Sequence, residues 1–207
     1  MTPRTSAAPR ARRTQADRSA TTRDALIAAA RQLFAEQGFA DVPTDAIVAA
    51  AGVTRGALYH QFADKTALFD AVVEAVEADI ARRLADEVAA AGISDPIEAM
   101  RCAVSTWLDI CVEPEIHRIA LIDGPSVLGW ARWREVCKRH VFGLVQALLT
   151  QALELGAIRP QPVQPLAHVL MGAGDEAALY VAEAADHAQA RAEMIAVLDQ
   201  LVGGMTA

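Results

Sequence analysis

Polar and basic side chains gather in a short stretch that begins at Thr44 and ends near Phe62. An arginine side chain can donate two hydrogen bonds to guanine, and a threonine hydroxyl can bond a base or a phosphate. Thr54 and Arg55 are therefore candidates for reading DNA bases, and Gly56 would let a helix come close to a DNA backbone. The candidates for contacts with phosphates are Thr44, Tyr59, His60 and Lys65.

Two short helices are needed to hold these side chains in place. The pattern predicts one helix over residues 44–51, a tight turn at Gly52, and a second helix that Thr54 caps and that ends near Phe62. Three apolar side chains can meet beneath the turn: Ile47, Val53 and Leu58. Such packing presents the second helix as a rod that fits a DNA major groove about 12 Å wide. This arrangement is a helix-turn-helix.

Charge is divided unequally along the chain. Residues 1–69 carry nine Lys and Arg against six Asp and Glu, whereas residues 70–207 carry ten against twenty. Residues 1–23 hold six arginines and one acid, which suits attraction to a polyanion. The simpler alternative for that segment is an unstructured tail that aids solubility. The net charge of −7 is therefore compatible with a DNA-binding N-terminal part.

Helical patterns cover most of the chain, and its many alanines favour helix over sheet. A first helix is expected from Thr22 to Gly38, and a long fourth helix from its cap at Asp64 to Gly92. The fourth helix should bury one apolar face and link the two parts of the molecule. Later helices are expected after Pro96, after Pro114, over about 128–155, over about 163–185 and over about 187–203.

Residues 22–70 resemble the TetR family of transcriptional repressors. The matching positions include Ala30, Leu33, Phe34, Gly38, Phe39, Ile47, Ala50, Gly52, Val53, Gly56, Leu58, Tyr59, Phe62, Lys65 and Leu68. The resemblance implies an all-helical homodimer with an N-terminal DNA-binding domain and a C-terminal ligand-binding domain. It also places Thr44, Arg55, Tyr59, His60 and Lys65 where the family contacts DNA.

We predict an all-α fold of about nine helices, in which an N-terminal three-helix domain joins a larger helical domain. The expected parts are a flexible basic arm at residues 1–20, a helix-turn-helix DNA-binding domain at 21–68, and a ligand-binding and dimerisation domain at 69–207. The predicted function is a homodimeric one-component transcriptional regulator, with repression expected as the family's usual mode, that a small, largely apolar or aromatic ligand releases from a palindromic operator.

The expected partners are double-stranded operator DNA, a second copy of the chain, and a small-molecule effector. No cofactor is expected. A cytoplasmic location is expected because no stretch approaches the roughly 18 apolar residues of a membrane span and the Arg-rich start lacks the apolar run of a secretory signal.

The tryptophans fall in helices that would enclose a central cavity, which indicates an apolar or aromatic ligand. Tryptophan also commonly fills a helical core, and that alternative stays open. Asp175 lies in an otherwise apolar helix and could present a carboxylate to a ligand that bears a donor or a positive charge. Its neighbour Glu176 is as well suited to solvent or to the rim of a dimer. The predicted ligand-binding residues are Trp107, Cys111, Trp130, Trp133, Cys137, Met171 and Asp175.

The last two expected helices carry apolar residues at helical spacing, with small residues that allow close approach. Paired with their symmetry mates they would form a four-helix bundle, whereas packing within one chain is the alternative. A dimer is mechanically useful because two recognition helices must enter major grooves about 34 Å apart. The predicted interface residues are Leu166, Leu170, Ala173, Ala177, Val181, Leu198 and Leu201.

Other classes of protein fit parts of the sequence. An architectural DNA-binding protein without a ligand would have its C-terminal domain packed solid, and the acidity of that domain argues against wrapping DNA. A helical enzyme would need a metal cage, a phosphate loop or an activated nucleophile, and the sequence offers no such motif. Cys137, His140 and His117 could suggest a metal or thiol sensor, but no second close pair of ligands supports one, so no metal site is expected.

Overall fold

The structure is a computed structural model that describes residues 15–206. Within this range the regular elements are helices, and the β-type pairing consists of an isolated bridge between Ile158 and Thr206. The predicted all-α fold is confirmed. Most of the predicted basic arm, residues 1–14, lies outside the described residues. The prediction is wrong for residues 15–20, which are helical.

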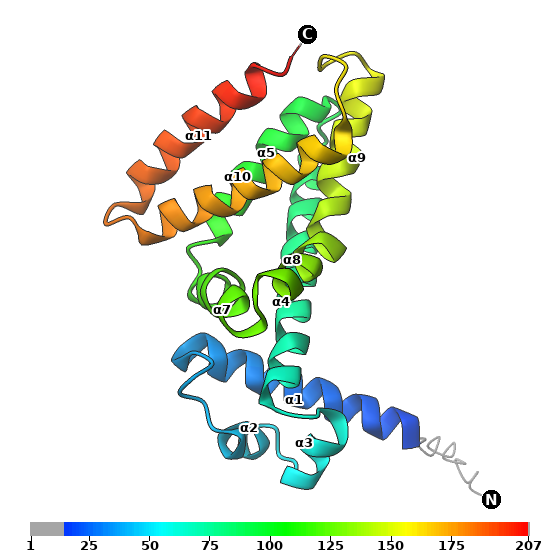
Figure 1. Cartoon of the computed structure of the whole chain (residues 1–207), viewed down its shortest axis with the longest axis vertical. Coiled ribbons are helices and arrows are strands. Elements are labelled where there is room, and N and C mark those ends of the chain that lie inside the picture. Colours follow the sequence, from blue (N-terminus) through cyan, green and yellow to red (C-terminus); the bar gives the residue numbers. More distant parts are fainter. Residues whose placement is uncertain (1–14, 207) are drawn as a thin grey trace, which may run out of the picture.

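The N-terminal end of the molecule is built from three helices, drawn in blue to cyan in Figure 1. They are α1 (Gln15–Gln37), α2 (Thr44–Ala50) and α3 (Arg55–Gln61). The predicted start of the first helix at Thr22 is wrong, because α1 already begins at Gln15. A contact with α3 holds the added turns, since Gln61 Nε2 donates to Ser19 Oγ at 2.7 Å.

Helix α4 (Lys65–Ala90) runs from this end into the rest of the molecule (Figure 1). Asp64 caps it as predicted, because its Oδ1 accepts the N–H of Ala67 at 2.7 Å. The predicted apolar face is buried along its length and comprises Leu68, Phe69, Val72, Val73, Val76, Ile80 and Leu84. One hydrophobic cluster continues from Leu26 in the N-terminal part to Met171 near the C-terminus. The predicted domain boundary after residue 68 stays a prediction.

The remaining helices form the larger part of the molecule. Their bounds are α5 (Pro96–Ile110), α6 (Pro114–Ile116), the π-helical η1 (His117–Asp123), α7 (Gly124–Leu128), α8 (Trp130–Cys137), the π-helical η2 (Lys138–Phe142), α9 (Gly143–Glu154), α10 (Val163–Glu183) and α11 (His187–Gly203). Because α6, η1 and α7 follow one another directly, as do α8, η2 and α9, residues 15–206 make nine helical rods, in agreement with the prediction. Among these described helices, none combines the length and the apolar composition needed to cross a membrane.

One charged side chain interrupts the buried face of α4. Glu77 is 5% exposed. Among the described residues, it is the one polar or charged residue that is buried. Burial disfavours the ionised form and raises the pKa of the Glu77 carboxyl from 4.5 to about 7.

This carboxyl group should make the free energy of unfolding depend on pH. Because its pKa is raised in the folded state, its favourable contribution is fully present below about pH 4.5 and is lost as the pH rises through about 7. We expect Glu77→Gln to resemble the wild type near pH 5 and to be more stable near pH 8, by at most about 3 kcal/mol. Urea unfolding at both pH values measures this difference, and a gain of the same size at both would contradict the prediction.

Candidate functional site

The helix-turn-helix forms one end of the molecule, where α2 and α3 lie on the outer surface (Figure 1). Gly52 has a φ of 64° in the turn between the two helices, as the tight turn requires. Ile47 and Leu58 are fully buried beneath it. Thr54 caps α3, since its Oγ1 accepts the N–H of Ala57 at 3.2 Å. The first turn of α3 is therefore held in place with its polar residues directed outward.

The seven predicted DNA-binding residues all lie at this end of the molecule. Thr44, the first residue of α2, is half-buried. The exposed members of the set are Thr54, Arg55, Gly56, Tyr59 and His60. Lys65 is half-buried, and its Nζ donates to the carbonyl of Ala40 at 3.4 Å and lies 4.3 Å from the centre of the Phe39 ring. Burial lowers the pKa of the Lys65 ammonium group.

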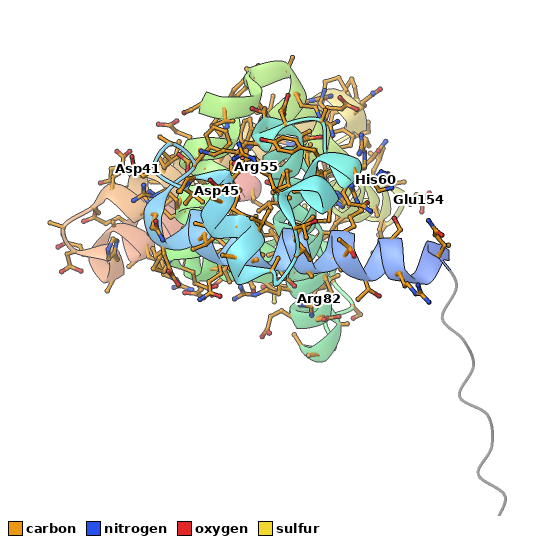
Figure 2. The ribbon with its side chains drawn as sticks, turned by 90° about the horizontal axis from the view of Figure 1, so that it is seen from below. Asp41, Asp45, Arg55, His60, Arg82 and Glu154 are labelled. Carbon is orange, nitrogen blue, oxygen red and sulfur yellow. The ribbon has the colours of Figure 1, made fainter. Side chains whose placement is uncertain are left out.

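Arg55 has an acidic neighbour that was not among the predicted residues. Its Nη1 lies 3.2 Å from Oδ1 of Asp45 on α2, and Figure 2 shows the two side chains together at this end. With side chains 61% and 71% exposed, the pair contributes little to stability, but it orients the guanidinium group. The sequence alone could not show this contact, because it depends on the angle between α2 and α3.

Gly56 is not required by the packing of the chain itself. A Cβ atom added there would meet only Oγ1 of Thr54 within 4 Å, at an ordinary contact distance of 3.9 Å. Its φ is not in the left-handed region that favours glycine. Among the described residues, neither packing nor backbone conformation requires glycine at this exposed position.

Polar contacts attach the helix-turn-helix to the larger part of the molecule. Arg31 of α1 makes two bonds of 2.7 Å to the carboxylate of Glu115 in α6. The backbone N–H of Phe39 donates to Oδ2 of Asp123, at the end of η1, at 2.8 Å. This bond directly connects η1 to the segment that follows α1.

A cavity of about 130 Å³ lies inside the larger part, with walls from α4, α5, η1, α8, η2, α9, α10 and α11. Five of the seven predicted ligand-binding residues line it: Trp107, Trp133, Cys137, Met171 and Asp175. Both tryptophans have satisfied indole N–H groups, which donate at 2.9 Å to the carbonyls of Gly174 and Ala120 respectively. The walls are otherwise almost entirely aliphatic.

Trp130 and Cys111 lie outside this cavity, which corrects two of the predicted ligand-binding residues. Trp130 is 65% exposed and packs on the outer side of Trp133, because it begins α8 directly after the turn at Gly129. Cys111 is buried between α5 and α10, where its thiol lies 3.7 Å from the carbonyl of Ala178. The helical spacing of Cys111 correctly indicated that its side chain is buried, but it could not show that α10 covers it.

The polar end of the cavity is acidic. Asp175 is paired with Arg134, and burial raises the pKa of its carboxyl although the arginine opposes the shift. Glu77, which was not among the predicted ligand-binding residues, also lines the cavity, and its Oε1 accepts a hydrogen bond from the thiol of Cys137 at 3.4 Å. The sequence did contain a sign of this residue's role, because Glu77 is an acid among the apolar residues of the fourth helix. Glu176, by contrast, is exposed.

His140 and Cys137 do not share a site. His140 Nε2 lies 2.6 Å from Oε2 of Glu74, whereas the thiol of Cys137 bonds Oε1 of Glu77. Across residues 15–206, no three side chains of the metal-binding types come close enough together to hold an ion.

The predicted dimer face is partly used inside the chain. Ala177, Val181 and Leu198 are buried in a cluster with Leu108 and Cys111, so this part of the prediction is corrected: their surfaces are already covered. Leu166, Leu170 and Ala173 are half-buried, and Leu201 is 55% exposed. Other apolar side chains of α10 and α11 are more than half exposed: Val169, Tyr180 and Val197.

Comparisons with known proteins agree with this geometry. The family described as bacterial regulatory proteins, tetR family, matches residues 26–72, and the tetracyclin repressor-like C-terminal domain matches residues 97–205. AcrR of Shigella flexneri, an HTH-type transcriptional regulator, is 35% identical over 100 residues, which cover 48% of this chain and 46% of that protein.

Solved structures extend the similarity to nearly the whole chain. A TetR-family transcriptional regulator from Pectobacterium atrosepticum is 37% identical, with a TM-score of 0.81 over 94% of this chain and 98% of that one. RolR, solved in complex with its ligand resorcinol, has a TM-score of 0.71 over 91% of this chain and 94% of its own, but at 21% identity it shows the fold alone. The chain therefore belongs to the TetR family of bacterial regulatory proteins, and it is a DNA-binding transcription regulator rather than an enzyme.

Proposed function

We propose that this regulator is a homodimeric repressor that binds a palindromic operator through α3 and leaves it when a small, largely apolar or aromatic ligand enters the cavity. One observation carries the proposal: α4 packs at one end against α1, which in turn contacts α2 and the recognition helix α3, and it forms a wall of the cavity at the other end. A ligand in the cavity therefore contacts the same helix that supports the DNA-binding surface.

At the DNA, Arg55 and Thr54 read bases, and Gly56 lets the first turn of α3 approach the backbone. Asp45 holds the guanidinium group of Arg55 before DNA arrives, which reduces the entropy lost on binding. Phosphates are bound by Thr44, Tyr59, His60 and Lys65. Lys65 reaches a phosphate by leaving its contacts with Phe39 and Ala40.

Helix η1 provides the route from the ligand to the DNA. Leu121 of η1 lines the cavity, and Trp133 bonds the carbonyl of its neighbour Ala120. Two residues farther along, Asp123 bonds the backbone of Phe39 at the end of α1. A ligand that displaces Leu121 or Trp133 thus moves the DNA-binding domain and changes the separation of the two recognition helices.

The cavity supports a ligand-responsive regulator over an architectural DNA-binding protein, which would have been packed solid around the tryptophans. The similarly folded RolR has been solved with and without resorcinol. We infer by analogy of fold that the cavity of this chain also holds a compact aromatic molecule.

Dimerisation uses the exposed apolar side chains of α10 and α11. Val197 and Leu201 lie one turn apart on α11, and Val169 and Tyr180 lie three turns apart on α10, so each pair shares a helix face. Covering these faces with the same helices of a second copy removes apolar surface from water.

A gel-shift assay with the DNA upstream of the protein's own gene, repeated with a library of small aromatic compounds, tests the whole proposal. We expect a specific shifted complex that some of these compounds release. A shift that no compound alters would favour the architectural alternative, and the absence of any specific shift would contradict the proposal.

Arg55→Ala should lower affinity for the operator much more than affinity for random DNA, because a bidentate base contact contributes about 1–3 kcal/mol of discrimination. Arg82→Ala is the matched control. Its side chain is also 61% exposed and also paired with aspartates, but it lies far along α4 (Figure 2). Fluorescence anisotropy with both DNAs measures the effect. An equal loss on both after Arg55→Ala would rule out base reading.

Gly56→Ala should separate folding from DNA binding. The added methyl group has room within the chain, and alanine is favoured over glycine in a helix by up to about 1 kcal/mol, so the melting temperature should stay the same or rise. Operator affinity should fall, because the methyl group occupies the space of the DNA backbone. Unchanged operator affinity would show that close approach at Gly56 is not needed.

Val197→Asp should weaken the dimer, since it places a charge in the proposed interface. Light scattering coupled to size exclusion should then find more of the 22.0 kDa monomer than in the wild type. Val112→Asp, the same change at an exposed valine just after α5, is the control and should leave the mass unchanged. A dimer equally resistant to dilution in both variants would place the interface elsewhere.

A further inference from the structure

The two acidic side chains at the cavity, Asp175 and Glu77, differ in how many of their carboxyl oxygens already have a bonding partner. The carboxylate of Asp175 is occupied by Arg134. Glu77 is 5% exposed, and the hydrogen bond that its carboxyl makes joins Oε1 to the weak thiol donor of Cys137. No hydrogen bond from the described residues reaches the other oxygen, Oε2, so a ligand that supplies a donor can bond it.

We propose that Glu77 is the polar anchor of the cavity and selects a single-ring aromatic ligand that carries a hydroxyl group, in preference to ligands that carry a carboxylate or an ammonium group. This inference rests on the proposed function, because it names the class of ligand that the sensor cavity takes. It assigns the selection to Glu77 rather than to Asp175, the residue that the sequence indicated.

The cavity has room for about one ring. Its volume is about 130 Å³, and an apolar cavity of about 150 Å³ is known to accept benzene. Trp107 and Trp133 contribute aromatic surface, which favours stacking or edge contacts with a ring. Their N–H groups already have backbone partners, so they add no free donors for a carboxylate.

The charges around Glu77 favour a neutral hydroxyl group. A hydroxyl can donate to the ionised carboxylate and can accept from the protonated acid, so it pairs with either form. A ligand carboxylate would face Glu77 and Asp175, and Arg134 is already paired with Asp175. An ammonium group would pay a cost of desolvation among the aliphatic walls that a neutral hydroxyl group avoids.

Four single-ring probes that differ in one group test the inference: phenol, toluene, benzoate and benzylamine. Each is titrated into the full chain, and binding is followed by calorimetry and by the fluorescence of the cavity tryptophans. Glu77→Gln keeps an acceptor, whereas Glu77→Met fills similar space without one. We expect the preference for phenol over toluene to persist in Glu77→Gln and to fall about tenfold in Glu77→Met, with benzoate the weakest probe for the wild type.

Ile80→Met is the matched control, because it alters the apolar wall one turn farther along α4 and should shift phenol and toluene alike. The inference is overturned if Glu77→Met keeps the preference for phenol, if benzoate or benzylamine binds more tightly than phenol, or if none of the four probes binds. Gel shifts on the same samples separate the two proposals. Specific DNA binding without a preference for phenol contradicts only the choice of ligand, whereas loss of specific binding contradicts the proposed function.

Discussion

The buried face of α4 must fit two different neighbours at once. Near its start, the ring of Phe69 meets that of Phe34 in α1 at 5.3 Å, and near its end Ile80 and Leu84 form the wall of the cavity. Each large side chain buried here contributes about 2 kcal/mol, so the helix cannot give up either neighbour without losing much of the stability of a typical domain. The DNA-binding end and the cavity therefore share one rigid element, and a shift at one end has to be accommodated at the other.

Ion pairs set the position of α8 on this helix more than they stabilise it. Arg132 bonds both carboxylate oxygens of Asp70 at 2.8 and 2.9 Å and also reaches Glu74 at 2.9 Å. These groups are about one-quarter exposed, so solvent weakens the attraction, but the paired geometry fixes the direction of the helix. The result is that Trp133 and Cys137, on the opposite side of α8, are held against the cavity. The uncompensated burial of Glu77 is tolerated within this arrangement.

Much of the fold could be predicted from the sequence, because helix starts and buried faces depend on neighbouring residues. Asp64 and Thr54 cap helices where their side chains predicted, and the apolar stripe of α4 is buried as its spacing indicated. The cover of a buried face depends on distant residues, and there prediction failed. Ala177 and Val181 have the spacing of an interface, but another helix of the same chain covers them. Trp130 was misplaced because a turn at Gly129 sets the phase of α8.

The bond between the backbone N–H of Phe39 and the side chain of Asp123 has a consequence for module exchange among relatives. The donor is a main-chain group, so any residue except proline at position 39 can supply it, whereas the acceptor must be a side chain of suitable length on η1. A DNA-binding domain transplanted from another family member would still supply the donor of this hydrogen bond, unless proline stood at position 39. The Arg31 and Glu115 pair, made by two side chains, would have to be carried over together. Chimeric regulators built on this chain would therefore depend more on keeping the ion pair between Arg31 and Glu115 than on keeping the bond between Phe39 and Asp123.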